Sequence, residues 1–217
     1  MYKALVVKEL RESAGLAALA VLAAVFLLGE LTGVRLTPWS SGRPAEYPFV
    51  SGDELYVFLW IVGAGLGGTL GLKQTAWELW QGTYFFLLHR PVRRRRVFGA
   101  KLAVGGGLLL GITGATILVF ALWAATPGHH ASPFLWSMTG TAWQQWFAMP
   151  LVYLGAFLSG IRPGAWYGSR FAPLLAGFAL ATLVASFPWW WAGVAVGVIA
   201  MAAYLAAIFM CAESRDY

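Results

Sequence analysis

Lys73 to Lys101 reads KQTAWELWQGTYFFLLHRPVRRRRVFGAK and lies between two long apolar runs. This segment holds seven of the 15 Lys and Arg residues of the chain, four of them consecutive at Arg93–Arg96. Basic residues gather in the cytoplasmic loops of membrane proteins, close to the ends of the spans. We therefore predict that this basic segment is a cytoplasmic connection between two membrane-spanning helices.

The composition of the chain predicts a membrane protein. Of its 217 residues 59% are hydrophobic and only 11% are charged, and the mean hydropathy is +0.69. Soluble domains carry about 25% charged residues. The net charge of +6 would suggest a nucleic-acid partner in a soluble chain, but here the cations lie at the ends of apolar runs, so no such partner is expected. The single Cys211 excludes an intrachain disulfide and a Cys metal cluster.

Six apolar runs are long enough to cross a bilayer, since a helical span needs about 20 residues. They are residues 14–33, 55–72, 102–125, 142–161, 171–187 and 191–211. An even number of spans puts both termini on one side, and 13 of the cations then lie on that side against two on the other. The prediction is an all-α polytopic membrane domain over residues 1–217, with both termini cytoplasmic.

The N-terminal residues are predicted to form a separate amphipathic helix. Over Tyr2–Glu12 apolar and charged residues alternate in the manner of a helix that lies in the membrane interface. The apolar run that follows is too long for a signal peptide and has no small-residue cleavage site after it. We therefore expect it to be a retained first span.

Catalytic and metal-binding patterns are not found in the sequence. Glu30 is the one Asp, Glu, Lys, Arg or His within the six runs, whereas ion-coupled carriers need such groups inside the membrane. The motifs of zinc peptidases, serine hydrolases and P-loop ATPases are missing. His129 and His130 are adjacent and are interpreted as solvated loop residues rather than metal ligands. We therefore expect that the chain is not an enzyme and that it holds no metal or cofactor.

Glycines spaced by four predict close helix packing. Gly63, Gly67 and Gly71 share one face of the second run, and Gly107 and Gly111 share a face of the third. Such faces serve packing within the chain or a dimer seam, and packing within the chain is the preferred interpretation.

The basic segment itself is predicted to contain a helix over Thr75–His89, which ends before Pro91 because a residue that precedes proline avoids the α region. At 100° per residue one stripe of this helix carries aromatic and leucine side chains for the membrane interface. A second stripe points toward the cytoplasm or a partner. It consists of Glu78, Gly82, Phe85 and His89. The four arginines alone require no more than a topological role and contact with anionic lipid.

The spacing of the basic segment resembles that of the ABC type-2 (ABC-2) exporter permeases. The resemblance rests on Glu78-x-x-x-Gly82-Thr83-x-x-x-Leu87-Leu88-x-x-Pro91-Val92-x-Arg94, followed by Lys101. Lys8-Glu9-Leu10-Arg11, ahead of the first span, is similar to the opening of that family.

The resemblance implies a permease subunit of an ATP-driven exporter in the plasma (inner) membrane of a bacterium. Two permease chains would form a dimer, and separate ATPase subunits that bind ATP and Mg²⁺ would dock on a coupling helix between the second and third spans. The matching positions are Glu78, Gly82, Thr83, Pro91, Arg94 and Lys101, and the outward stripe adds Phe85 and His89. The alternative is a non-transporting membrane anchor or scaffold subunit.

Overall fold

The computed structural model describes residues 2–38, 42–49, 54–82, 94–128, 130, 132–163 and 169–214. Throughout these ranges the regular structure is helical, with no strand. The first and last helices are α1 (Tyr2–Thr32) and α9 (Trp190–Ser214). Between them lie α2 (Glu54–Phe58), η1 (Leu59–Ala64), α3 (Gly65–Leu72), η2 (Lys73–Trp77), α4 (Glu78–Trp80), α6 (Arg94–Ala124), η3 (Trp136–Thr139), α7 (Gly140–Ile161) and α8 (Ala172–Ser186). The all-helical prediction is confirmed.

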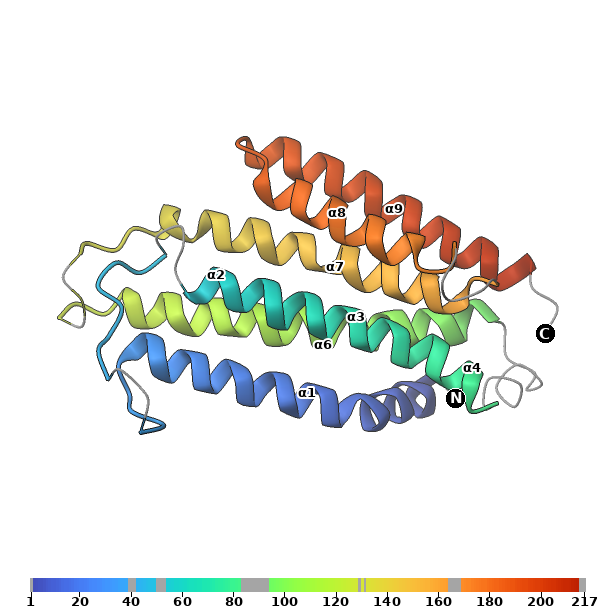
Figure 1. Cartoon of the computed structure of the whole chain (residues 1–217), viewed down its shortest axis with the longest axis horizontal. Coiled ribbons are helices and arrows are strands. Elements are labelled where there is room, and N and C mark those ends of the chain that lie inside the picture. Colours follow the sequence, from blue (N-terminus) through green and yellow to red (C-terminus); the bar gives the residue numbers. More distant parts are fainter. Residues whose placement is uncertain are drawn as a thin grey trace.

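The long helices lie side by side in one elongated bundle, with α7 at its centre (Figure 1). α7 contacts α3, α6, α8 and α9, and every residue from Leu151 to Ile161 is buried. A helix that is apolar on all sides belongs in the middle of a bundle, and Pro150 is accommodated inside α7. The start of α1 and the end of α9 lie at the same end of the bundle (Figure 1), together with α4.

Within the described ranges, four helical segments are long and apolar enough to cross a membrane: Lys3–Thr32, Glu54–Trp80, Arg94–Ala124 and Trp190–Glu213. The prediction of several membrane-spanning helices is therefore confirmed in this coarse form. α8 has 15 residues and a length of about 22 Å, which is less than the roughly 30 Å of a bilayer's hydrocarbon core. α7 and α8 pack closely against each other.

The prediction of a separate N-terminal interfacial helix is wrong. α1 is continuous from Tyr2 to Thr32, so residues 2–12 extend the first span instead of lying apart from it. The physical reason is that the charged turn faces the bundle: Glu9 and Ser13 are buried, at 2% and 1% exposure. Their burial aligns the start of α1 with the rest of the helix.

The helix predicted over Thr75–His89 is also wrong in its bounds. The second span continues through η2 and α4 and ends at Trp80. Gly82 lies two residues later, in a turn, with φ +70°. Glycine is favoured in this left-handed conformation, which ends many helices. Two stretches of this span, η1 and η2, are π-helical. A π turn changes the angle between successive side chains, so a projection at 100° per residue through Lys73–Trp77 places the following residues on the wrong face.

Candidate functional site

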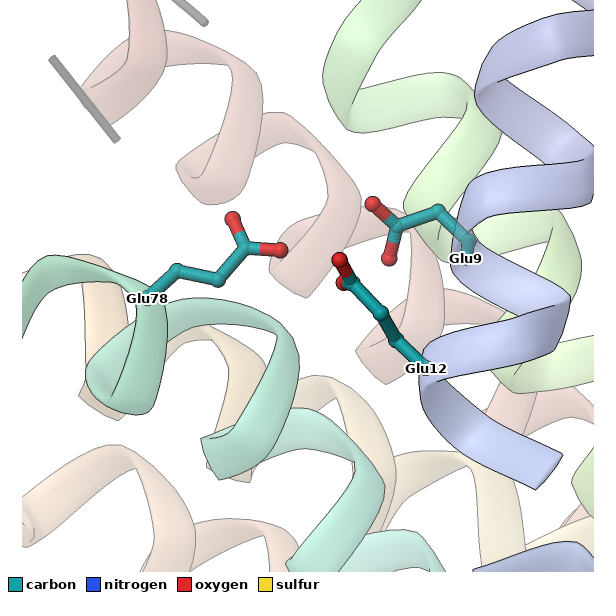
Figure 2. Close-up of side chains that lie close together, drawn as sticks. All are labelled: Glu9, Glu12 and Glu78. Carbon is teal, nitrogen blue, oxygen red and sulfur yellow. The ribbon is translucent and has the colours of Figure 1, made fainter. Parts of the chain in front are cut away.

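Five charged side chains from three helices meet at the end of the bundle that holds both termini. Lys8, Glu9 and Glu12 come from α1, Glu78 from α4 and Lys101 from α6. Figure 2 shows the carboxylates of Glu9 and Glu12 directed across the gap between α1 and α4 toward that of Glu78. We call these five residues the charge cluster.

Lys101 is the centre of the charge cluster. Its Nζ donates to Oε1 of Glu9 at 2.8 Å and to Oε1 of Glu78 at 2.6 Å, and its side chain is only 1% exposed. A buried ammonium is costly unless carboxylates and hydrogen bonds compensate for the lost water. The two short contacts supply this compensation and join the starts of α1 and α6 to the end of the second span.

Lys8 adds a second cation at the rim of the cluster. Its Nζ lies 3.3 Å from carboxylate oxygens of both Glu12 and Glu78 and 3.5 Å from Glu9, and its side chain is 35% exposed. The cluster thus contains three carboxylates and two ammonium groups, an excess of one negative charge. Oε2 of Glu9 is buried without a hydrogen-bond partner among the described residues, so this excess is only partly compensated.

A layer of neutral hydrogen bonds fixes the backbone of Lys101. The hydroxyl of Tyr153, on α7, donates to Oε1 of Gln74 at 2.7 Å, and its oxygen lies 3.2 Å from the Lys101 carbonyl oxygen. Nε2 of Gln74 donates to the same carbonyl at 3.1 Å. Gly105 leaves the space for this network, since a Cβ there would lie 2.6 Å from Gln74 Oε1 and 2.7 Å from Tyr153 Cζ. The network connects the π-helical η2 to α6 and α7.

The charge cluster joins three helices through ion pairs. Oxygens of Glu9, Glu12 and Glu78 lie within 4.8 Å of one another, a spacing that suits a metal ion. However, Lys101 Nζ already lies between Glu9 and Glu78, in the position that a cation would take. The arrangement therefore favours an ion-paired junction of three helices over a metal site.

The structure places the predicted docking residues in different settings. Glu78 is 5% exposed and faces the charge cluster, so the prediction that it points to the cytoplasm or to a partner is wrong. Lys101 lies in the same cluster, Gly82 is in the turn after α4, and Arg94 is the half-buried first residue of α6. The remaining four predicted positions lie outside the described residues: Thr83, Phe85, His89 and Pro91.

The two glycine faces differ in their surroundings. Gly63, Gly67 and Gly71 lie against α7; a Cβ at Gly71 would come within 2.7 Å of the Tyr153 carbonyl oxygen and 2.8 Å of the Phe157 nitrogen. By contrast, a Cβ at Gly107 or Gly111 would meet no described atom within 4 Å. The packing within the chain that was predicted for these two glycines is therefore not found in the described part of the chain.

Sequence reasoning missed most of the charge cluster and its supporting network. Glu9 was noted only as part of a motif, and Gln74 and Tyr153 were not considered. One signal was present: Lys101 directly precedes a long apolar run, and a lysine that enters the bundle has to be paired with a carboxylate. The predicted cytoplasmic side holds few carboxylates, and Glu9, Glu12 and Glu78 are among them.

The fold and the site define a helical chain with several helices apolar enough to cross a membrane and a buried ionic junction at one end of the bundle. Comparisons with protein-family models, with curated proteins and with solved structures found no match for this chain.

Proposed function

We propose that this chain is the permease subunit of an ATP-binding-cassette exporter. It would form part of the translocation path and be coupled through residues 73–101 to separate ATPase subunits. One observation carries the proposal: Glu78 and Lys101, two positions of the spacing that resembles ABC-2 permeases, form a 2.6 Å ion pair across 23 residues of chain. Oε1 of Glu9, from the second motif, lies 2.8 Å from the same Lys101 Nζ.

In the proposed mechanism, the charge cluster carries motion from the docking segment into the bundle. An ATPase that binds residues 83–93 would pull on the end of α4 and on the start of α6, which flank that segment. Lys101 and Glu78 tie these two ends together, and Glu9 connects them to α1. Because the junction is buried and short, displacement of one helix end would displace the other two.

The proposal includes a topology and an assembly. All six apolar runs would cross the membrane, with both termini and the charge cluster on the cytoplasmic side of a plasma (inner) membrane. A second permease chain would complete the path, and the ATPase subunits would bind ATP and Mg²⁺. The basic residues support this orientation, since Arg94, Arg95 and Arg96 begin α6 at the same end of the bundle as α4.

The second candidate function is a non-transporting anchor or scaffold subunit of a membrane complex. The burial of Glu78 favours this alternative, because its carboxylate binds Lys101 and Lys8 within the chain instead of facing outward. A rigid junction of this kind is also what a static bundle requires.

The deciding experiment starts from the native membrane. The chain is purified with its associated proteins, an ATP-hydrolysing subunit is identified, and both are reconstituted into vesicles. The proposal expects the permease to change the rate of ATP hydrolysis, and it expects Glu78→Gln to weaken that coupling while the ATPase still co-purifies. Arg35→Gln, at an exposed position after α1 and outside residues 73–101, is the control. An ATPase whose rate is the same with and without the chain would favour the scaffold, and the lack of any such subunit would overturn the exporter proposal.

The topology has its own test. Thr83→Cys and Thr126→Cys are introduced separately into a Cys211→Ser background and labelled in intact cells with a membrane-impermeant maleimide. The proposed orientation expects labelling at position 126, which follows α6, and none at position 83. The reverse pattern would place the basic segment outside and refute the docking role.

A further inference from the structure

A groove of about 870 Å³ lies along the second span on the side of α1. It is within the size range of small-molecule sites, about 300–1,000 Å³. Its deeper part is lined by Leu16 of α1 and by Thr69 and Leu72 of α3. Farther along the span it is lined by Lys73, Trp77 and Trp80, and Arg170 contributes from the segment before α8. The groove therefore changes from apolar to cationic and aromatic toward the end of the bundle that holds the charge cluster.

The two cations of the groove are held in place by main-chain carbonyls. Nζ of Lys73 donates to the carbonyl of Glu12, whose carboxylate is engaged by Lys8. The guanidinium of Arg170 donates to the carbonyls of Ser159 at 3.2 Å and Gly160 at 3.0 Å, at the end of α7. No acidic residue is among the described residues that line the groove. Its charge is thus positive and positioned before any ligand binds.

Two exposed tryptophans mark the depth of the cationic end. Trp77 and Trp80 are 48% and 79% exposed, and their rings pack edge to face with centroids 5.3 Å apart. Exposed tryptophan beside lysine at the end of an apolar helix is typical of the membrane–water interface. Leu16 and Leu72 then lie at the depth of acyl chains. Lys73 is about one turn deeper than Trp77, and its Nζ extends toward the headgroup phosphates, where it donates to the carbonyl of Glu12.

We propose that this groove is a binding site for an anionic phospholipid. The acyl chains would lie along Leu16 and Leu72, and the phosphate would lie beside Lys73 and Arg170. A phospholipid can contact the apolar walls of the groove, whereas a free anion gains nothing from them. The two cations, Lys73 and Arg170, favour a headgroup with net negative charge. The inference is independent of transport, since it needs only that this end of the bundle lies at a membrane surface.

The test measures lipid binding to the purified full-length chain in detergent by native mass spectrometry. Phosphatidylglycerol and phosphatidylcholine with the same acyl chains are added in turn. A basic residue near anionic lipid contributes about 1 kcal/mol, so Lys73→Gln is expected to lower phosphatidylglycerol affinity about fivefold. Arg35→Gln removes the same charge from an exposed cation that follows α1 and does not line the groove, and it should leave that affinity unchanged.

A second variant tests the groove itself. Thr69 is exposed and lines the groove, so Thr69→Trp should obstruct its apolar part, abolish the preference for phosphatidylglycerol and leave the melting temperature intact. Val119→Trp, on an exposed face of α6 outside the groove, is the control and should retain binding. Equal binding of both lipids to the unaltered chain, or equal loss in Lys73→Gln and Arg35→Gln, would overturn the proposal. Equally tight binding of sn-glycerol 3-phosphate would identify a phosphate site and refute the lipid assignment.

Discussion

Replacement of Lys101 by Met is the most direct test of the charge cluster. Methionine keeps an unbranched apolar side chain but removes the ammonium that lies 2.8 Å from Glu9 and 2.6 Å from Glu78. Two buried carboxylates then lose the cation that they share, and the partly exposed Lys8 lies 3.5 Å from Glu9 and 3.3 Å from Glu78. Removing one partner of a buried ion pair costs about 3–5 kcal/mol, because the remaining charge is left uncompensated. We expect a free energy of unfolding lower by about that amount.

The assay is thermal or dodecyl-sulfate unfolding of the purified chain in mild detergent, followed by size-exclusion chromatography. Arg95→Met is the control because it breaks the pair between Arg95 and Glu213, whose side chains are 69% and 48% exposed. It is expected to change the melting temperature little, since exposed pairs contribute little to stability.

A compensating variant separates charge from packing. Combining Lys101→Met with Glu9→Gln and Glu78→Gln removes both orphaned carboxylates, and stability should largely return, because neutral replacement of a buried ionic group is often tolerated. If Lys101→Met melts at the same temperature as Arg95→Met, the cluster is not a stabilising junction. If the triple variant is as unstable as the single one, lost packing and not uncompensated charge is the cause.

Two further predictions concern the contacts of α7. Gly71→Ala should lower the free energy of unfolding by about 1–3 kcal/mol, because the new Cβ would meet main-chain atoms of α7 at 2.7 and 2.8 Å. Gly68→Ala, on the same helix but facing open space, should be neutral or stabilising, and an equal loss in both would contradict the packing argument. Tyr153→Phe should cost about 1–3 kcal/mol, since it leaves the buried Oε1 of Gln74 without this donor. The same unfolding assay with Tyr47→Phe, at a 60% exposed site, should show no change.

The helices themselves could be predicted because apolar runs of about 20 residues leave the backbone no alternative in lipid. The ends of the helices could not be predicted, because charged residues usually limit a membrane span. Glu9 and Glu78 carry charge but are buried, at 2% and 5% exposure, so the helices continue through them. The π-helical turn at Lys73–Trp77 likewise has no signal in the hydropathy of the sequence, and it changes which face Glu78 occupies.

The pairing of distant charges was beyond the sequence for a different reason. Glu9 and Lys101 are 92 residues apart, and Glu78 and Lys101 are 23 apart. Charge counting treats each cation as a topological signal and assigns it no partner. Only the packing of α1, α6 and the second span shows that Lys101 joins helices, in addition to its predicted place at the end of an apolar run.

The burial of Glu78 changes what its role in the proposed exporter would have to be. A docked ATPase would reach this carboxylate only by separating it from Lys101 and Lys8, which lie 2.6 and 3.3 Å from it. Breaking such a buried pair is costly, so direct contact is disfavoured and a linking role is preferred. Glu78→Gln should then leave ATPase binding intact and reduce the response of hydrolysis to the permease. A variant that loses the bound ATPase, while its melting temperature stays unchanged, would show instead that Glu78 is part of the docking surface.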